Sequence, residues 1–436
     1  MNAKMKSLIG YILPALGSLF VTYLYNVVDG IFVGQGVGSA ALGAVNIAVP
    51  FITSSTAVTA MFPMGGATVA AIRMGREDKE GANHAFMTAV SLTLLMSAVL
   101  MTAGMVFSHE IVNMSGARQL SAEMQEMSAQ YLFYYSAFSI PMLIGACLAV
   151  FVRNDGSPTL SFVGMCAGAA ANIFLDWLFI FYFKMGIVGA AVASGLGQFL
   201  TVLVLLTHFV RRKGDLRFKP FKRDSALIKK VCKRGMPEAV TQLTTPVSAL
   251  CYNLVLARMI GDIGVSTFSI LSFIYSLANA ILSGVAQGLQ PLWGQCYGRK
   301  DAEEMAWYFR SGLIINIVLS ALIFGVLFFF DAPVIRIFNK EAELVQTASA
   351  ALPLFALSFI PMALNLIYTA YFFSTKRTGT ANAIAISRGV AVKALMIFCI
   401  PMVFGTDAIW LAPLVTEILT LIAAAVLSRT SRLIYR

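Results

Sequence analysis

The sequence predicts an all-α membrane protein that crosses the bilayer many times. Of its 436 residues, 58% are hydrophobic and only 12% are charged, and the mean hydropathy is +0.79. A soluble domain carries about 25% charged residues, so this composition excludes an ordinary soluble fold. Apolar runs of about 20 residues, the length that crosses the hydrocarbon of a bilayer, recur along the chain. Short segments that are charged or contain glycine and proline separate these runs.

We expect twelve transmembrane helices from these runs. The first run is too long for a cleavable signal peptide, and no small-residue cleavage site follows it, so we expect it to remain as the first span. The expected spans are residues 9–34, 44–72, 84–108, 128–152, 159–183, 187–210, 236–260, 266–296, 308–330, 347–373, 380–403 and 407–428.

The positions of lysine and arginine predict the orientation of the chain. Most of the 32 basic residues fall in segments on the same side of the membrane as the N-terminus. The positive-inside rule places that side in the cytoplasm, so we expect both termini there. The net charge of +11 then reflects topology and contact with anionic lipid headgroups, not a nucleic-acid partner.

The basic segment 211–234 divides the chain into halves. We expect an N-terminal six-helix lobe (1–210), a cytoplasmic linker (211–234) and a C-terminal six-helix lobe (235–436). Three motifs recur in order: Tyr25-Asn26-Val27-Val28 as Tyr252-Asn253-Leu254-Val255, Gly75-Arg76-Glu77-Asp78 as Gly298-Arg299-Lys300-Asp301, and Ile140-Pro141-Met142 as Ile360-Pro361-Met362. Both halves begin inside, so the repeat is parallel, and parallel repeats are a recurring design of transporters.

Two aspartates are expected at one depth in the N-terminal lobe. Asp29 lies about 19 residues beyond the cytoplasmic start of its span and Asp176 about 17 beyond the start of its own, so a rise of about 1.5 Å per residue places them within about 3 Å in depth. Tyr25 and Asn172 each precede one aspartate by a turn, on the same face. Two carboxylates in one low-dielectric pocket cannot both ionise cheaply, so we expect one to bind a proton or cation. The alternative is that each aspartate only hydrogen-bonds a neighbouring helix.

Two further charges are expected to meet in the C-terminal lobe. Arg388 lies about 8 residues into the eleventh span, and Glu417 lies about 11 residues from the inner end of the twelfth. Their similar depth in adjacent helices predicts a buried ion pair. We favour a structural role for this pair, and a role in substrate binding or gating is the alternative. Glu238, at the cytoplasmic end of the seventh span, is the other acid near a span.

The cysteines and histidines predict no cofactor. None of the six cysteines forms a C-x-x-C pair, and the three histidines share no ligand spacing, so we expect neither disulfides nor a metal centre. Oxygens from aspartate, asparagine and hydroxyl side chains are instead suited to Na⁺ or H⁺. We therefore expect one of these two ions as a coupling ion.

Several ordered motifs resemble the MATE (multidrug and toxic-compound extrusion) transporters over essentially the whole chain. Pro14 followed by Tyr25-Asn26-x-x-Asp29-x-x-Phe32-x-Gly34 is similar to the opening helix of that family. Asn172-x-x-Leu175-Asp176 and Arg153-Asn154-Asp155-Gly156-Ser157-Pro158 resemble its fifth helix and the loop before it. The resemblance implies two six-helix bundles facing each other in a V. It also implies Na⁺- or H⁺-driven efflux of amphipathic, mostly cationic compounds across a bacterial inner membrane.

The resemblance also assigns residues. The family's N-lobe cation residues carry over to Tyr25, Asp29, Asn172, Asp176 and Ser194, where serine stands at a position that is commonly threonine. Pro14 is implied as a point where the first helix bends. The tenth span lacks the acid of NorM-type members, so the chain is closer to the DinF/MepA-like branches.

Two other functions compete with export. A flippase of lipid-linked oligosaccharides needs a cationic cavity for a pyrophosphate, whereas the N-terminal spans offer Asp29 and Asp176 and no mid-span Lys or Arg. A membrane-embedded enzyme is disfavoured because no H-E-x-x-H or G-x-S-x-G motif occurs. We expect a monomer whose partners are small amphipathic substrates and the lipid bilayer.

Overall fold

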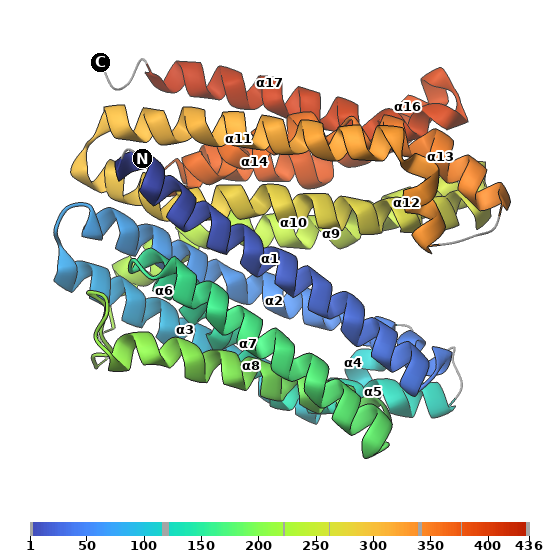
Figure 1. The fold of residues 1–436 in the computed structure, drawn as a ribbon, viewed down its shortest axis with the longest axis horizontal. Coiled ribbons are helices and arrows are strands. Elements are labelled where there is room, and N and C mark those ends of the chain that lie inside the picture. The colour runs from blue at the N-terminus through green and yellow to red at the C-terminus, as the bar shows by residue number, and fades with distance from the viewer. Residues whose placement is uncertain are drawn as a thin grey trace. The chain divides into compact units, whose positions relative to one another are not determined.

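The fold is built from helices alone in the part of the chain that the structure describes (Figure 1). The structure is a computed structural model, and it describes residues 3–115, 122–220, 223–260, 262–338, 342–375 and 377–432. An all-α membrane protein was predicted, and this prediction is confirmed.

The helices up to the basic segment are α1 (Ala3–Gly36), α2 (Ser39–Met74), α3 (Lys79–Val106), α4 (Ser108–Met114), α5 (Ala122–Ala137), α6 (Ser139–Asn154), α7 (Pro158–Asp176), the π-helical η2 (Trp177–Tyr182) and α8 (Gly186–Val210). Those after it are α9 (Ser225–Met259), α10 (Asp262–Arg299), α11 (Ala302–Phe329), α12 (Asp331–Phe338), α13 (Ala342–Ala356), α14 (Phe359–Ser374), α15 (Thr378–Ile386), the π-helical η3 (Ser387–Ala391), α16 (Val392–Phe404), the 3₁₀ helix η4 (Thr406–Leu411) and α17 (Ala412–Arg432).

Nine helices within the described residues are long and apolar enough to cross a membrane, and the count is eleven if two bent pairs are each one span. Twelve spans were expected. The span expected at 236–260 accounts for the difference, because it lies in α9, which is not among the eleven. That helix starts at Ser225, so it includes the last ten residues of the expected linker 211–234 and their basic side chains.

The two bent spans occur at equivalent places in the sequence repeat. α5 and α6 meet at 51°, and α13 and α14 meet at 41°. Pro141 and Pro361 each occupy the third position of the second helix in its pair. Because proline has no backbone N–H, it cannot continue the hydrogen-bond ladder of the preceding helix, but it is tolerated in the first turn of a new one. The recurring Ile-Pro-Met motif therefore explains both bends.

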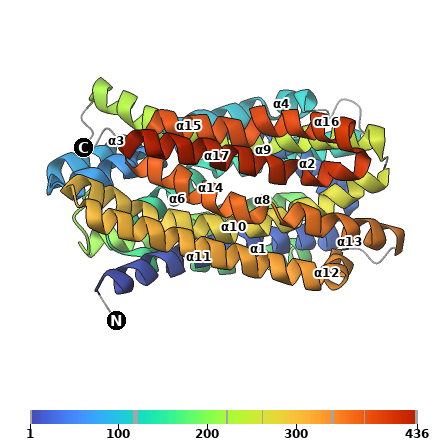
Figure 2. The same cartoon turned by 90° about the horizontal axis from the view of Figure 1, so that it is seen from above.

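The chain forms two compact units. The first comprises residues 1–239 and 294–300, and the second comprises residues 240–293 and 301–436. In the first unit α7 packs along α8, and α1 packs on α7 (Figure 1). In the second unit α14 contacts α11 and α17, and α16 lies beside α17 (Figure 2).

Close packing of α7 on α8 depends on glycine. A Cβ atom on Gly197 would lie 2.8 Å from the carbonyl oxygen of Gly168 and 2.9 Å from Cβ of Asn172. Small residues of this kind let helix backbones approach closely in membranes. The contact brings the polar side chain of Asn172 against α8, where the candidate site is built.

Candidate functional site

The end of α7 carries the most deeply buried part of the candidate site. Asp176 is fully buried, and Asn172, one turn earlier on the same face, is 2% exposed. The α-helix ends at Asp176 and the chain continues as the π-helical η2. π-helical turns inside α-helices are frequent at functional sites, and this one directly follows the aspartate.

Asp29 of α1 completes a pair of carboxyl groups. Its side chain lies against that of Asp176, as the shared depth predicted. An ionised carboxylate only accepts hydrogen bonds. Two carboxylates can therefore remain in contact only when a proton or a cation lies between them or one of them is neutral.

Four oxygen atoms of this cluster are buried without a hydrogen-bond partner among the described residues. They are Oδ1 of Asp29, Oδ1 of Asn172 and both Oδ atoms of Asp176. A buried polar atom without a partner is costly. These acceptors therefore form a place where a proton or a hard cation would be stabilised.

α8 and the first helix supply the remaining predicted residues. The Ser194 hydroxyl accepts a hydrogen bond of 3.3 Å from the Asn172 side-chain amide. The Tyr25 hydroxyl contacts the side chain of Gln198, also on α8, and lies close to Asp29. The structure thus brings Tyr25, Ser194 and Asn172 together around the two aspartates.

Three residues near the site were not predicted. Tyr131 and Tyr135 of α5 lie close enough to Asp29 to interact with its charge, and their ring centroids are 5.8 Å apart. Gln198 contacts Tyr25. In the sequence, the only indication of these tyrosines was their spacing of one helical turn within an apolar span.

The donor set decides which ions suit the site. Carboxylate, amide and hydroxyl oxygens are hard ligands, and His and Cys side chains are not among them. Within the described ranges no group of three or more His, Cys, Asp or Glu residues is placed to hold a metal ion. Oxygen ligands of this kind can hold a proton or a hard cation.

Pro14 and Glu238, the other predicted residues of the first unit, have surroundings of their own. α1 continues through Pro14, and the Ser18 hydroxyl donates to the Pro14 carbonyl oxygen at 2.8 Å. Glu238 interacts electrostatically with the buried Arg153. This partner gives Glu238 a structural explanation within the first unit.

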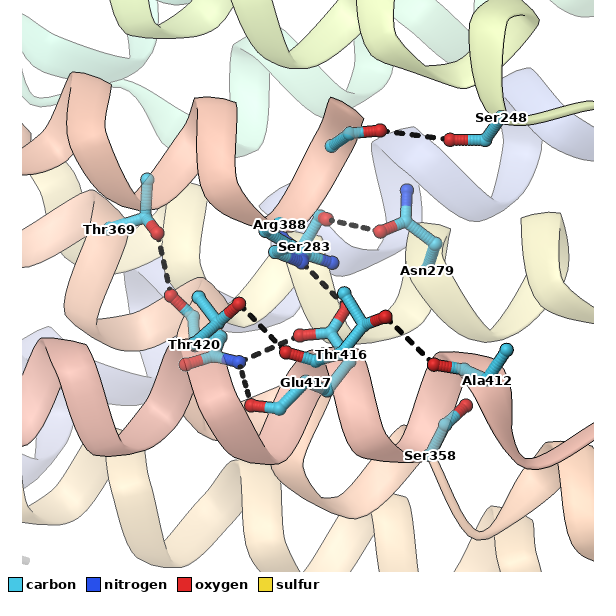
Figure 3. A network of polar contacts seen from close by, with 12 residues as sticks. Ser248, Asn279, Ser283, Ser358, Thr369, Arg388, Ala412, Thr416, Glu417 and Thr420 are labelled. Atoms are coloured by element: carbon cyan, nitrogen blue, oxygen red, sulfur yellow. Dashed lines mark hydrogen bonds and ion pairs between the residues drawn. The ribbon is translucent and has the colours of Figure 1, made fainter. Parts of the chain in front are cut away.

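The second unit contains the predicted ion pair. Arg388 Nε donates to Glu417 Oε1 at 2.8 Å (Figure 3), and Asn365 Nδ2 donates to Glu417 Oε2 at 2.7 Å. Arg388 is carried by the π-helical η3 and Glu417 by α17. Both oxygens of Glu417 are therefore satisfied, as a buried charge requires.

Comparison with known proteins agrees with the repeat and with the resemblance seen in the sequence. The sequence profile of the MatE family matches residues 14–178 and again residues 237–401. The chain belongs to the MatE family. The two matches cover the two halves in which the sequence motifs recur. Members of this family are transporters, so the chain is not an enzyme.

Relatives and solved structures of this family align over nearly the whole chain. The multidrug export protein MepA of Staphylococcus saprophyticus is 21% identical over 97% of this chain and 93% of its own length. MepA of Staphylococcus aureus MRSA252 is 22% identical over 96% of this chain and 92% of its own. An outward-facing structure of a multidrug resistance MATE transporter has a TM-score of 0.92 at 20% identity, covering 99% of this chain and 96% of the other. The predicted MATE fold of the MepA-like type is therefore confirmed.

Proposed function

We propose that the chain exports amphipathic, mostly cationic small molecules across a bacterial plasma membrane in exchange for Na⁺ or H⁺. The observation that supports the coupling is the contact between Asp29 and Asp176, together with the four unpaired oxygens around it. The MepA relatives, which are named as multidrug export proteins, support export of drugs, and the two carboxyl groups of the site support a preference for cations. Both termini lie in the cytoplasm on this proposal.

The carboxyl groups of Asp29 and Asp176 would couple ion binding to transport, because their net charge changes when the ion binds. A coupling ion drives export only if it binds the outward- and inward-facing states with different affinity. With Asp29 and Asp176 both ionised, the cluster repels itself and attracts a cation. When a proton or Na⁺ binds, the repulsion is removed, α1 bends at Pro14 and the drug is released outside. The ion is then discharged into the cytoplasm.

The surrounding residues have defined roles in this proposal. Asn172 and Ser194 hydrogen-bond each other, so the free Oδ1 of Asn172 is oriented toward the ion rather than toward solvent. Tyr25, held through Gln198, fixes the depth of Asp29 relative to α8. The tyrosines of α5 lie close to Asp29, and in this proposal their buried rings help to exclude water from the pair.

The site charge distinguishes export of cations from the competing flippase function. A pyrophosphate headgroup requires basic side chains, whereas the cluster in the first unit presents two carboxylates. A cationic drug and a cation would both be attracted to this cluster, so the presence of one would disfavour the other. That competition is what an antiporter needs.

Transport in proteoliposomes tests the proposal. A fluorescent cationic dye is loaded, and a Na⁺ gradient or a pH gradient is imposed separately. Dye movement against its own gradient under one of the two conditions is the expected result. Absence of movement under both gradients, from vesicles in which the protein is folded and oriented, would exclude cation-coupled export.

A further inference from the structure

The first unit contains a buried arginine that no carboxylate neutralises. Arg234 lies in the N-terminal part of α9 and is 6% exposed. Within the described residues, no ion pair joins its guanidinium to a carboxylate. Glu238, one turn further along α9, interacts with the buried Arg153. A buried charge without a partner of opposite sign is costly, so an anion from outside the chain would be stabilised beside Arg234.

Close backbone contacts of glycine bring α2 and α10 to this arginine. A Cβ atom on Gly235, the residue that follows the arginine, would overlap the carbonyl oxygen of Met61 in α2. A Cβ atom on Gly75, directly after α2, would overlap the carbonyl oxygen of Gln295 in α10. All of these residues belong to the first unit. The start of α9, the end of α10 and the second half of α2 therefore form one packed region.

The same region adds further groups that can bind an anion. Arg73, in the last turn of α2, and Arg76, just after it, lie close enough to Arg234 to repel its charge. Tyr297 of α10 also lies close enough to interact with this charge. Its hydroxyl group can donate a hydrogen bond. Three guanidinium groups and one hydroxyl group are thus gathered from three helices.

The nearby acids leave part of this positive charge uncompensated. Asp78 Oδ2 lies 3.8 Å from Arg73 Nε, so Asp78 offsets one of the three arginines. Glu77 and Asp215 both interact with Lys79. The other two arginines have no ion pair within the part of the chain that the structure describes. Two positive charges therefore remain in excess.

We propose that Arg234, Arg73 and Arg76 bind a phosphate group, which belongs to an anionic phospholipid or to free phosphate. A guanidinium group is planar and always charged, and its N–H groups match phosphate oxygens in bidentate geometry. Basic pockets between the ends of membrane helices are suited to anionic headgroups. The bound phosphate group would bridge α2, α9 and α10, which come from both halves of the sequence repeat.

Thermal unfolding of the purified full-length protein in detergent tests this, because a ligand that binds only the folded state raises its melting temperature with concentration. The probes are inorganic phosphate, compared with sodium chloride at equal ionic strength, and phosphatidylglycerol, compared with zwitterionic phosphatidylcholine at equal mole fraction. At least one probe should raise the melting temperature of the wild type above its control. Arg234→Gln should weaken the apparent affinity for that probe by about tenfold, the value of one charge-assisted hydrogen bond. Arg336→Gln, which removes an exposed arginine of α12 in the second unit, is the matched control and should respond as the wild type does.

The two probes distinguish the sources of the phosphate group. A shift with phosphatidylglycerol alone identifies a lipid headgroup as the ligand, and a shift with inorganic phosphate shows that the phosphate group suffices. The inference is overturned if neither probe shifts the wild type above its control, or if Arg234→Gln and Arg336→Gln weaken the response equally or not at all. If Arg234→Gln is poorly folded, Arg76→Gln removes an exposed arginine of the same site and gives the same comparison.

Discussion

Arg388 and Glu417 form an ion pair in which Nε and Oε1 are 2.8 Å apart and the side chains are 10% and 7% exposed. Removing one partner of such a pair leaves the other charge uncompensated, at a cost of about 3–5 kcal/mol. We expect Glu417→Ala to lower the folded yield and the melting temperature of the protein. Both are measured in detergent by size-exclusion chromatography and thermal unfolding.

The double variant is the control for this pair. Arg388→Leu combined with Glu417→Ala removes both charges, so part of the lost yield should return. Asn365 also donates to the Glu417 carbonyl oxygen, at 2.8 Å, and this bond survives the substitution. If each single variant instead kept normal yield and stability and lost transport equally, the pair would act in transport and not in folding.

Asp155 organises the chain that follows α8. Its Oδ2 lies 2.8 Å from Nε2 of the buried His208, and its carboxylate accepts from the backbone N–H groups of Asp215 and Leu216 at 2.9 and 3.1 Å. Asp155→Ala leaves the buried N–H groups of His208 and Leu216 without this acceptor, at about 1–3 kcal/mol for each. We expect a lower melting temperature and faster amide hydrogen exchange at Leu216.

A second contact to the same segment is the control. The ammonium of Lys79 lies 2.9 Å from Asp215 Oδ1, but both side chains are largely exposed. Exposed ion pairs contribute little to stability, so Lys79→Ala should leave the melting temperature nearly unchanged. If both variants lowered the melting temperature equally, burial of Asp155 would not explain its contribution to stability.

The orientation of the chain can be tested at two loops. Lys219 is exposed and lies in the segment between α8 and α9, three residues after the buried Leu216. Gly405 lies between α16 and η4. A short tag inserted at Lys219 should react only from the cytoplasm, and one at Gly405 only from outside. Labelling of intact cells and of inverted vesicles with an impermeant reagent distinguishes the two. The opposite pattern would reverse the orientation and place Asp29 and Asp176 in the inner half of the membrane.

The sequence predicted the relationships that follow from helix geometry. The rise per residue placed Asp29 and Asp176 at one depth, and the same reasoning paired Arg388 with Glu417. Both contacts are present. The position of a residue along a span predicts its depth in the membrane, and the helical period predicts the face on which its side chain lies. Both predictions are possible because a span has a fixed direction and length.

Contacts made by side chains from distant loops and helices could not be predicted in this way. The spacing of the histidines pointed to no partner for His208, yet it pairs with Asp155, which is 53 positions away. The approach of Tyr131 and Tyr135 to Asp29 depends on how α5 packs, and no sequence period encodes this. The start of α9 at Ser225 was also missed, because its basic first turns resemble a polar linker.

The coupling proposal predicts what happens when the charge of the buried carboxyl pair is removed. Asp176→Asn keeps the size of the side chain and removes its charge, so the protein should fold normally. Gradient-driven export should fall by tenfold or more, because the neutral pair no longer distinguishes the ion-bound from the ion-free state. Asp29→Asn should act in the same direction and less severely, since Asp29 is the less buried of the two.

Binding measurements separate coupling from substrate recognition in these variants. Detergent-solubilised Asp176→Asn should still bind a cationic dye, while the release of dye by Na⁺ or by acid, seen with the wild type, should fail. Asp407→Asn, which neutralises an exposed carboxylate in η4, is the matched control and should release dye normally. If the double variant of Asp29 and Asp176 exported dye at the wild-type rate under the same gradient, the coupling ion would bind elsewhere. Glu238 and Glu417 would then be the carboxylates to substitute. Each already has a basic partner, so the folded yield of these variants must be measured together with their export.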